Sequence, residues 1–143
     1  MAMLEGLKTK LESLKVDEDT AWFHVVDREV QFEIIRLNTE DQLFKDGIDS
    51  LGADLPDYSD ASVNVYGKRP GHMTLKDTGE FYQSFVVRVD RTGINIIADT
   101  QKEDKDLLEY GEIIGLTDEN IELLRDMLII NYREYLRDKL FAA

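Results

Sequence analysis

The sequence predicts an α+β fold, and three observations support that prediction. Apolar residues recur with helical spacing at both ends of the chain, an alternating apolar pattern occupies residues 85–98, and a Gly- and Asp-rich segment precedes it. At 143 residues the chain has the length of one ordinary domain, so we expect a single domain over 1–143. The expected order is two helices, a long loop or arm, a short helix, an antiparallel β-hairpin contributing to a small sheet, and a long C-terminal helix.

Two amphipathic helices are predicted at the N-terminus. The first carries a narrow apolar stripe at spacings of three and four residues, formed by Leu4, Leu7, Leu11 and Leu14. An acidic run at 17–19 supplies an N-cap candidate and first-turn acids for the second helix. The second amphipathic stretch extends from about Thr20 to Phe44, and we expect a break near Asn38-Thr39.

Residues 46–73 are predicted to form an extended loop or arm. Gly, Asp, Ser and Pro residues punctuate this segment around isolated apolar side chains. One short strand is expected at Ser62–Tyr66, where apolar residues gather. A loop of this length inside a compact domain is uncommon and usually has a function.

A short helix and a hairpin follow the predicted arm. Asp77 and Glu80 have the spacing of a capping box, which predicts a helix ending at about Ser84. Alternating apolar residues then surround a turn at 90–93, which predicts a β-hairpin over 85–98. A polar, solvated connection is expected at 99–106.

The last element is predicted as a long helix. Residues 117–120 provide its cap, and the helix is expected to continue to about Phe141. Its apolar positions form one broad face, made of Ile121, Leu124, Leu128, Tyr132 and Tyr135 with Leu123, Met127 and Leu136 beside them.

Composition excludes several classes of function. Thirty acidic against 17 basic residues give a net charge of −13, which disfavours binding to nucleic acid or to an anionic membrane. The chain has no cysteine, so disulfides, thiolate metal sites and cysteine nucleophiles are excluded. No basic leader with an apolar run and no run of 18 apolar residues is present, which predicts a soluble protein that stays where it is made.

The triplet Asp77-Thr78-Gly79 is the strongest candidate for catalysis. Dimeric aspartic proteases hold one of their two carboxylates in such a triplet, and Ile113–Leu116 resembles a second element of those enzymes. The neighbours differ, because Lys76 precedes the triplet and Glu80 follows it, where a second acid would repel the pair. Asp77 is therefore interpreted as a helix cap, with a dimeric aspartic protease as the weaker alternative.

Metal and cofactor motifs receive little support from the sequence. His24 and His72 have no partner at ligand spacing, which argues against a zinc site. The acidic cluster of the arm lacks the alternating register of a Ca²⁺ loop and is interpreted as solvated, with an adventitious divalent cation as the lesser alternative: Asp46, Asp49, Asp54, Asp57 and Asp60. Motifs for nucleophilic hydrolysis and phosphate binding are missing. We expect no cofactor, no metal and no catalytic residue.

One ordered set of motifs resembles a known family. A Gly-x-Asp-x-x-Gly turn at 47–52, Tyr58-Ser59, the basic pair Lys68-Arg69 and the run Leu75–Ser84 follow one another, and a Tyr-Gly…Gly-Leu-Thr element comes later at 110–117. This combination resembles tail-completion and virion-morphogenesis proteins of tailed bacteriophages, and its Phe-Tyr variant is most similar to those of Bacteroidetes phages, including crAss-like phages. The residues that carry the resemblance are Asp49, Gly52, Tyr58, Leu75, Asp77, Thr78, Gly79, Phe81, Ser84, Gly111 and Gly115.

The resemblance implies a structural role without enzymatic activity. Members of such a family form homo-oligomeric rings, sixfold or twelvefold, at the neck, the head-tail junction or the tail end of the virion, after assembly in the cytoplasm of the host bacterium. Portal, connector or tail proteins are the implied partners, and DNA only passes through the channel. Simple solubility is the ordinary interpretation of the acidic excess, and repulsion of DNA from the channel lining is the alternative. Interface residues are expected in Ile48–Tyr66, in 85–98 and on the helix beginning near Asp118. An assembly factor absent from the mature particle is the alternative.

Overall fold

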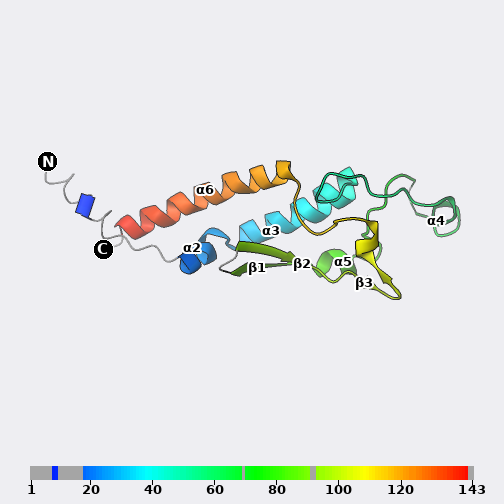
Figure 1. The fold of residues 1–143 in the computed structure, drawn as a ribbon, viewed down its shortest axis with the longest axis horizontal. Helices are drawn as coiled ribbons and strands as arrows, with labels where there is room; N and C mark the ends of the chain where they lie inside the picture. The colour runs from blue at the N-terminus through cyan, green and yellow to red at the C-terminus, as the bar shows by residue number, and fades with distance from the viewer. Residues whose placement is uncertain (1–7, 10–17, 69, 91–92, 142–143) are drawn as a thin grey trace.

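The computed structural model describes residues 8–9, 18–68, 70–90 and 93–141 as an elongated α+β fold, which confirms the predicted class (Figure 1). Long helix α6 lies along one side of the described body and a β-hairpin along the other, with helices between them (Figure 1). The first predicted helix, with its four leucines, and the acidic cap candidate at 17 lie outside the described residues.

The second amphipathic stretch forms three consecutive helical segments. Helices α2 (Glu18–Val25) and α3 (Arg28–Arg36) are separated at Asp27, whose side chain accepts a hydrogen bond from the Val30 amide at 2.9 Å and caps α3. A π-helix, η1 (Leu37–Asp46), then follows without interruption. The predicted break near Asn38-Thr39 is wrong, because the Asn38 side chain bonds to a distant segment and leaves the helical backbone intact.

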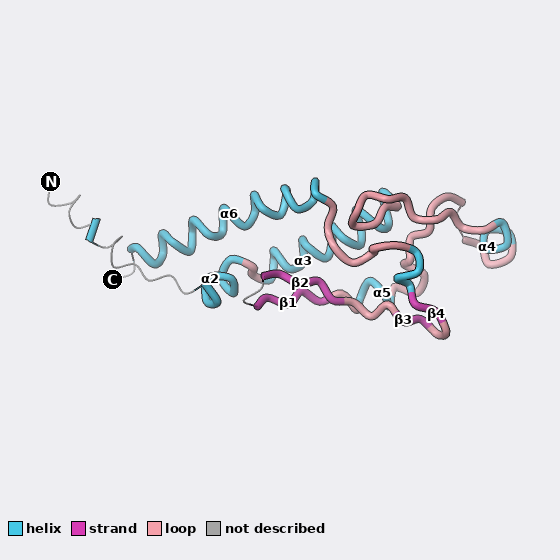
Figure 2. The backbone as a smooth tube through the Cα atoms, viewed as in Figure 1, coloured by secondary structure: helices cyan, strands magenta, loops and turns pink. Residues whose placement is uncertain are grey.

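The arm at 46–73 is mostly irregular and carries one short helix, α4 (Asp60–Asn64), at the end of the molecule far from α2 and from the C-terminal end of α6 (Figure 2). The strand predicted at Ser62–Tyr66 is wrong. Ser59 accepts a hydrogen bond from the Ser62 amide at 3.1 Å, and this cap starts a helix despite the β-branched residues nearby. An isolated antiparallel bridge between Asp57 and His72 closes the base of the arm.

Helix α5 (Glu80–Gln83) begins where a short helix was predicted, but its cap differs. Gly79 occupies the N-cap position in a left-handed conformation, with φ of 89°, and no side chain caps the helix. The capping box of Asp77 and Glu80 is therefore wrong. The Asp77 carboxylate forms ion pairs with Lys68 and Lys102, which lie far from it in the sequence.

The predicted β-hairpin is confirmed. Strands β1 (Val86–Asp90) and β2 (Gly93–Ile97) pair antiparallel, and no third strand joins them among the described residues. Arg91 and Thr92 of the predicted turn lie outside the described residues. The polar connection that follows contains a second, very short hairpin of β3 (Gln101–Lys102) and β4 (Lys105–Asp106), and a 3-10 helix, η2 (Leu107–Tyr110), comes next.

Helix α6 (Asp118–Phe141) has the predicted bounds and cap. Thr117 Oγ1 accepts a hydrogen bond from the Asn120 amide at 3.3 Å. The helix runs antiparallel to α2, α3 and η1, since Asn131 near its C-terminal half donates to the Val25 carbonyl at 3.0 Å and Asn120 reaches Gln42. Its predicted broad face is only partly used, because Leu124 and Tyr135 are buried while Ile121 and Tyr132 are exposed.

The core consists of two neighbouring clusters. One lies between the helices and the hairpin, with buried residues Val26, Val30, Ile34, Val87 and Leu124. The other lies where η1, the base of the arm and α5 meet, with buried residues Leu43, Leu55, Phe81, Tyr82, Phe85, Leu107 and Ile113. Apolar burial in these clusters, at about 25 cal/mol per Å², is the main stabilising contribution to the fold.

Candidate functional site

A buried side chain of η1 holds a distant extended segment in place. Asn38 Nδ2 donates to the Ile113 carbonyl at 2.9 Å, and Asn38 Oδ1 accepts from the Gly115 amide at 2.7 Å. The Asn38 side chain is fully buried, so these bonds replace the water that both backbone groups would otherwise bind. The Asn38 amide thus bonds backbone groups of this segment, as the backbone of a neighbouring strand would in a β-sheet.

Gln42 continues the same pattern four residues further along η1. Its Nε2 donates to the Gly115 carbonyl at 2.9 Å, and its Oε1 accepts from the Thr117 amide at 2.9 Å and from the Asn120 side chain at 2.7 Å. Gln42 is also fully buried. The segment 113–117 and the first turn of α6 are therefore fixed to the π-helix by two adjacent side chains.

Asp49 fixes the other side of this segment. Its Oδ1 accepts from the amides of Leu51 at 3.0 Å and Ala53 at 2.9 Å, and its Oδ2 accepts from the Glu112 amide at 3.2 Å. The Ser50 amide donates back to the Glu112 carbonyl at 2.9 Å. We refer to Asn38, Gln42, Asp49 and the segment 111–117 as the anchor network. In the described part of the chain, every buried side-chain nitrogen and oxygen has a partner.

Glycines are required at two close contacts, one beside the anchor network and one within it. A Cβ on Gly47 would lie 2.3 Å from Cγ of His72, whose ring bonds to the Phe44 carbonyl through Nε2 at 2.8 Å. A Cβ on Gly111 would lie 2.9 Å from Oδ2 of Asp49. The motif glycines thus allow the loop, the histidine ring and the extended segment to approach one another.

A second group of motif residues joins the arm to α5. The Tyr58 hydroxyl lies 3.2 Å from both Oγ1 and the amide of Thr74, and the Tyr82 hydroxyl donates to the Thr74 carbonyl. Burial raises the pKa of Tyr82, so its hydroxyl stays protonated as the donor. Phe81 is buried beside this group and packs edge-on against Phe85 at 5.0 Å between ring centroids.

Asp77 lies on the surface between two lysines. Its Oδ1 is 2.7 Å from Nζ of Lys68, and its Oδ2 is paired with Lys102. Hydrogen bonds from Lys102 and Lys68 lower the pKa of the Asp77 carboxyl to about 2. The aspartate of an aspartic protease shares a proton with a second carboxylate, whereas here two ammonium groups stabilise the ionised form.

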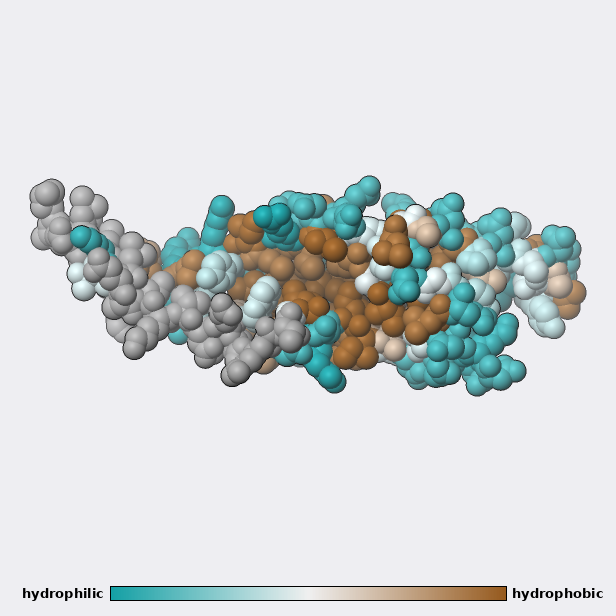
Figure 3. All heavy atoms as spheres, viewed as in Figure 1, coloured by the Kyte–Doolittle hydropathy of each residue, from teal (hydrophilic) through white to brown (hydrophobic). Residues whose placement is uncertain are grey.

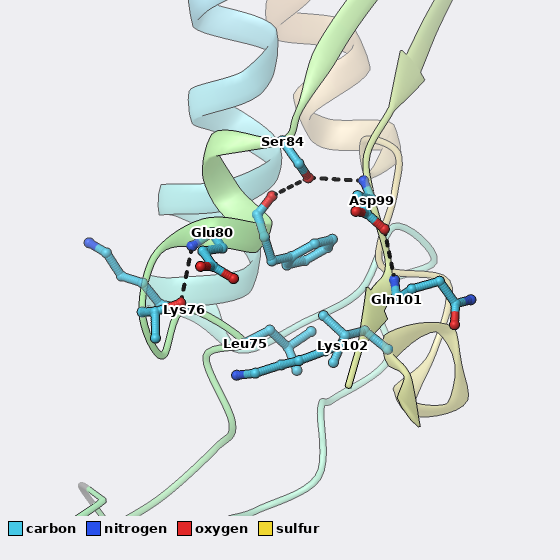
Figure 4. Close-up of a pocket in the computed structure, with 10 residues that line it drawn as sticks. Leu75, Lys76, Glu80, Ser84, Asp99, Gln101 and Lys102 are labelled. Carbon is cyan, nitrogen blue, oxygen red and sulfur yellow. Dashed lines mark hydrogen bonds between the residues drawn. The ribbon is translucent and has the colours of Figure 1, made fainter. Parts of the chain in front are cut away.

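A small pocket lies beside α5 (Figure 4). Ser84 Oγ donates to the Phe81 carbonyl at 2.6 Å and accepts from the Asp99 amide at 2.9 Å, which joins the end of α5 to the strand exit (Figure 4). Leu75, Lys76 and Lys102 also line the pocket. Its volume of about 70 Å³ holds a few water molecules, whereas sites for small ligands usually measure about 300–1,000 Å³.

The sequence motifs therefore fall into separate structural groups. Asp49, Gly52, Gly111 and Gly115 meet at the anchor network, where the Gly52 amide donates to the Asp49 carbonyl at 3.1 Å. The remaining ones lie around α5, namely Tyr58, Leu75, Asp77, Thr78, Gly79, Phe81 and Ser84. Sequence reasoning missed Asn38, Gln42 and the ring of His72. For Asn38 and Gln42 the sequence did contain a signal, because two side-chain amides stand four residues apart within a predicted amphipathic helix.

The histidines and the acidic residues of the arm do not converge. His24 stacks on Tyr135 at 5.2 Å between ring centroids, while His72 packs on Gly47 at the base of the arm. Among the described residues, no three His, Asp or Glu side chains are grouped so that they would hold a metal ion. No helix within the described ranges is long and apolar enough to cross a membrane.

Large apolar side chains are exposed on three elements. Val65 and Tyr66 follow α4 at the tip of the arm, Val86 and Ile97 form a directly opposed pair on the outer face of the hairpin, and a further set lies on α6: Ile121, Leu123, Ile129, Ile130, Tyr132 and Phe141. Phe23, Phe32, Leu51 and Leu108 are exposed elsewhere. Figure 3 shows hydrophobic residues in a continuous band over the middle of the molecule, where α6, α3 and the hairpin lie.

No family model, curated protein or solved structure matches the chain.

Proposed function

We propose that the chain is a structural subunit of a tailed-bacteriophage particle. Copies of it would form a homo-oligomeric ring, sixfold or twelvefold, at the neck, the head-tail junction or the tail end. Portal, connector or tail proteins of the same particle are the proposed neighbours, and the ring has no catalytic function. The ordered motifs from Gly47 to Thr117 suggest this family, and the geometry of the chain supports the role.

The observation that carries the proposal is the exposure of large apolar side chains on separate elements of an elongated chain. Val65 and Tyr66 at the arm tip are 72% and 76% exposed, and they lie at the opposite end from the C-terminus of α6. Exposed apolar groups that gather on one protein typically mark contacts with other proteins. A closed ring needs two different surfaces on each copy, one for each neighbour, and exposed apolar side chains on more than one element can supply them.

The motif residues support a structural role by the way they are used. Asp49 and its surroundings satisfy backbone groups, and Asp77 is neutralised by two lysines, so neither carboxylate is placed to act as an acid or base. Replacing Asp77 with Asn tests the protease alternative. Loss of peptide cleavage in that variant would favour a protease, whereas a structural role predicts no cleavage by the wild-type chain either.

The acidic excess fits passage of DNA through such a ring. A net charge of −13 repels phosphates, so a channel lined by part of it would not retain the genome. Binding of the purified chain to duplex DNA at low ionic strength would contradict this part of the proposal. A basic channel lining in the assembled particle would contradict it as well.

Mass spectrometry of purified particles tests the proposal directly. Virions of the phage that encodes this chain are banded by density, digested and analysed for its peptides, with the major capsid protein as the reference for copy number. The proposal predicts a stoichiometry of six or twelve copies per particle. Absence from complete virions, combined with presence in infected cells, would support the assembly-factor alternative and overturn the ring.

A further inference from the structure

One side of α6 carries three large apolar side chains in a line. Leu123, Ile130 and Phe141 are 54%, 57% and 60% exposed. They are spaced by seven and eleven residues, and at 3.6 residues per turn these intervals return to the same side of a helix. We call these three residues the α6 stripe. The described residues leave more than half of each of these side chains open to solvent.

Acidic side chains border the α6 stripe. Glu119, Asp126 and Glu134 are exposed and lie within a fraction of a turn of it, and Arg137 is the basic residue beside them. A row of apolar side chains flanked by acidic residues favours a partner whose apolar side chains are flanked by basic residues. Paired helices use the same arrangement, with opposite charges beside the apolar contact. The chemistry of the stripe thus specifies the chemistry of its occupant.

The N-terminal segment of the chain has that chemistry. Its four leucines between Leu4 and Leu14 share one side of a helical pattern, with Lys8 and Lys15 next to them on one flank and Lys10 on the other. Residues 1–15 contain three lysines and two glutamates, whereas the rest of the chain contains 14 basic and 28 acidic residues (17 − 3 and 30 − 2). The segment is therefore net positive in a strongly acidic protein.

The arm is a poorer occupant for the α6 stripe. It offers Val65 and Tyr66, but residues 46–73 contain five aspartates against Lys68 and Arg69. Like charges placed across an interface oppose association. Charge thus favours the N-terminal segment over the arm.

We propose that residues 1–15 of one copy dock on the α6 stripe of the neighbouring copy. The proposal rests on the proposed function and deepens it, because it names a contact between adjacent subunits of the ring. As a helix, Leu4–Leu14 would span about 15 Å at 1.5 Å per residue, which is enough to cover the C-terminal part of the stripe, the roughly 16.5 Å between Ile130 and Phe141. Donor and acceptor surfaces differ, so the contact is heterologous and can propagate around a ring.

The position of the two surfaces suits neighbours that stand side by side. Helix α2, which follows the N-terminal segment, packs on the C-terminal half of α6, since Asn131 bonds to Val25 and His24 stacks on Tyr135. The start of α2 at Glu18 therefore lies at the same end of the molecule as the C-terminal half of α6, which contains Ile130 and Phe141 (Figure 1). Cyclic symmetry relates the copies by rotation alone, so corresponding parts of all copies lie at the same height along the ring axis. The N-terminal segment of one copy and the α6 stripe of the next can therefore meet if both lie at that height.

Light scattering on the full-length chain tests this contact with three variants. Ile130→Ser alters the acceptor and Leu11→Ser alters the donor, while Ile129→Ser is the matched control because it changes the same residue type on the other flank of α6. We expect each of the first two to raise the dissociation constant between copies by about tenfold or more, and the control to leave it nearly unchanged. Circular dichroism confirms that every variant is folded.

Mixing the two defective variants separates this contact from other arrangements. A Leu11→Ser chain keeps an intact stripe and an Ile130→Ser chain keeps an intact donor, so the mixture should recover pairs that neither variant forms alone. A mixture that remains dissociated, a Leu11→Ser variant that associates like the wild type, or a wild-type chain that stays monomeric at about 100 µM would each overturn the proposal. If the chain were nevertheless detected in virions, the proposed ring would stand, and its subunits would have to contact one another through other surfaces.

Discussion

The anchor network and α6 use their side chains in opposite ways. In the anchor network, buried polar groups such as Gln42 and Asp49 are fully paired within the chain, and glycines allow the closest approaches. On α6, only Leu124 and Tyr135 are buried, and six of the large apolar side chains are exposed to solvent. The first region specifies the fold of one copy, and the second is the surface that we propose contacts other copies. Substitutions in the two regions should therefore affect different measurements.

The largest loss of stability is expected for Gln42→Ala. It removes the partner of the Gly115 carbonyl, the Thr117 amide and the Asn120 side chain, and it leaves a cavity. Together these effects should lower the free energy of unfolding by about 4 kcal/mol, measured by urea denaturation. Gln83→Ala, at an exposed helical glutamine, is the control and should change it by less than about 0.5 kcal/mol. Equal effects of the two would refute the importance of the network.

Asp49→Ala should rank next. Three amides, those of Leu51, Ala53 and Glu112, would lose a nearly buried acceptor, at a cost of about 3 kcal/mol. Asp54→Ala changes the same residue type in the same loop at an exposed position and should have almost no effect. Thermal unfolding followed by circular dichroism compares the pair. A melting temperature for Asp49→Ala equal to that of Asp54→Ala would show that the loop is not held by this carboxylate.

Two glycines separate backbone strain from close packing. Gly47 and Gly52 both have positive φ, of 65° and 82°, so alanine at either position costs about 1–2 kcal/mol of strain. Only Gly47→Ala also meets the His72 ring, and we expect it to lower stability by about 2 kcal/mol more than Gly52→Ala. Adding His72→Ala to Gly47→Ala should recover part of the loss in a double-mutant cycle. The absence of any coupling would contradict the close packing.

How far the sequence predicts this molecule depends on how local each determinant is. The hairpin and the bounds of α6 follow from alternation and from a cap within three residues of Thr117, so both are confirmed. The continuation of the helix through Asn38 depends on partners 75 and 77 residues away, which no local pattern contains. Asp77 has the spacing of a cap, but Lys102, 25 residues further on, binds its carboxylate instead.

The strand predicted at Ser62–Tyr66 failed for a local reason, because Ser59 caps α4 and its hydrogen bond prevails over the apolar pattern. The separation of α2 from α3, which was not predicted, is also local, since Asp27 caps α3. Both are residue types that favour N-caps, so the signal was present in the sequence. The anchor network itself combines segments from 38 to 120, and its assembly could be inferred only from the fold.

A smaller effect is expected from pH through Asp77. Its carboxyl has a folded-state pKa of about 2, below the ordinary 3.8, so the ionised form is favoured in the folded chain. This contribution is complete above about pH 4 and is lost as the pH falls through 2. The side chain is 42% exposed, so screening limits the contribution to about 1 kcal/mol or less. Comparing Asp77→Asn with the wild type between pH 5 and 2 should show the difference shrinking; a constant difference would contradict the ion pairs.

The smallest effect on stability is expected at the arm tip. Tyr66→Ser removes an exposed side chain and should change the free energy of unfolding by less than about 0.5 kcal/mol. Under the proposed function, the same variant should reduce the yield of complete particles when it replaces the wild type during infection, because the proposal assigns the Tyr66 side chain to a contact with a neighbouring subunit. Normal particle yield would show that the arm tip is not an interface. A large loss of stability would contradict its exposure in the isolated chain.

A cryo-EM map of the head-tail junction and tail of the phage tests the central claim most directly. We expect a closed ring of this chain, with the arm tip and the α6 stripe covered by neighbouring subunits and acidic side chains toward the channel. A map in which every ring is built from other proteins would contradict it. So would a ring in which Tyr66 and Ile130 both remain open to solvent.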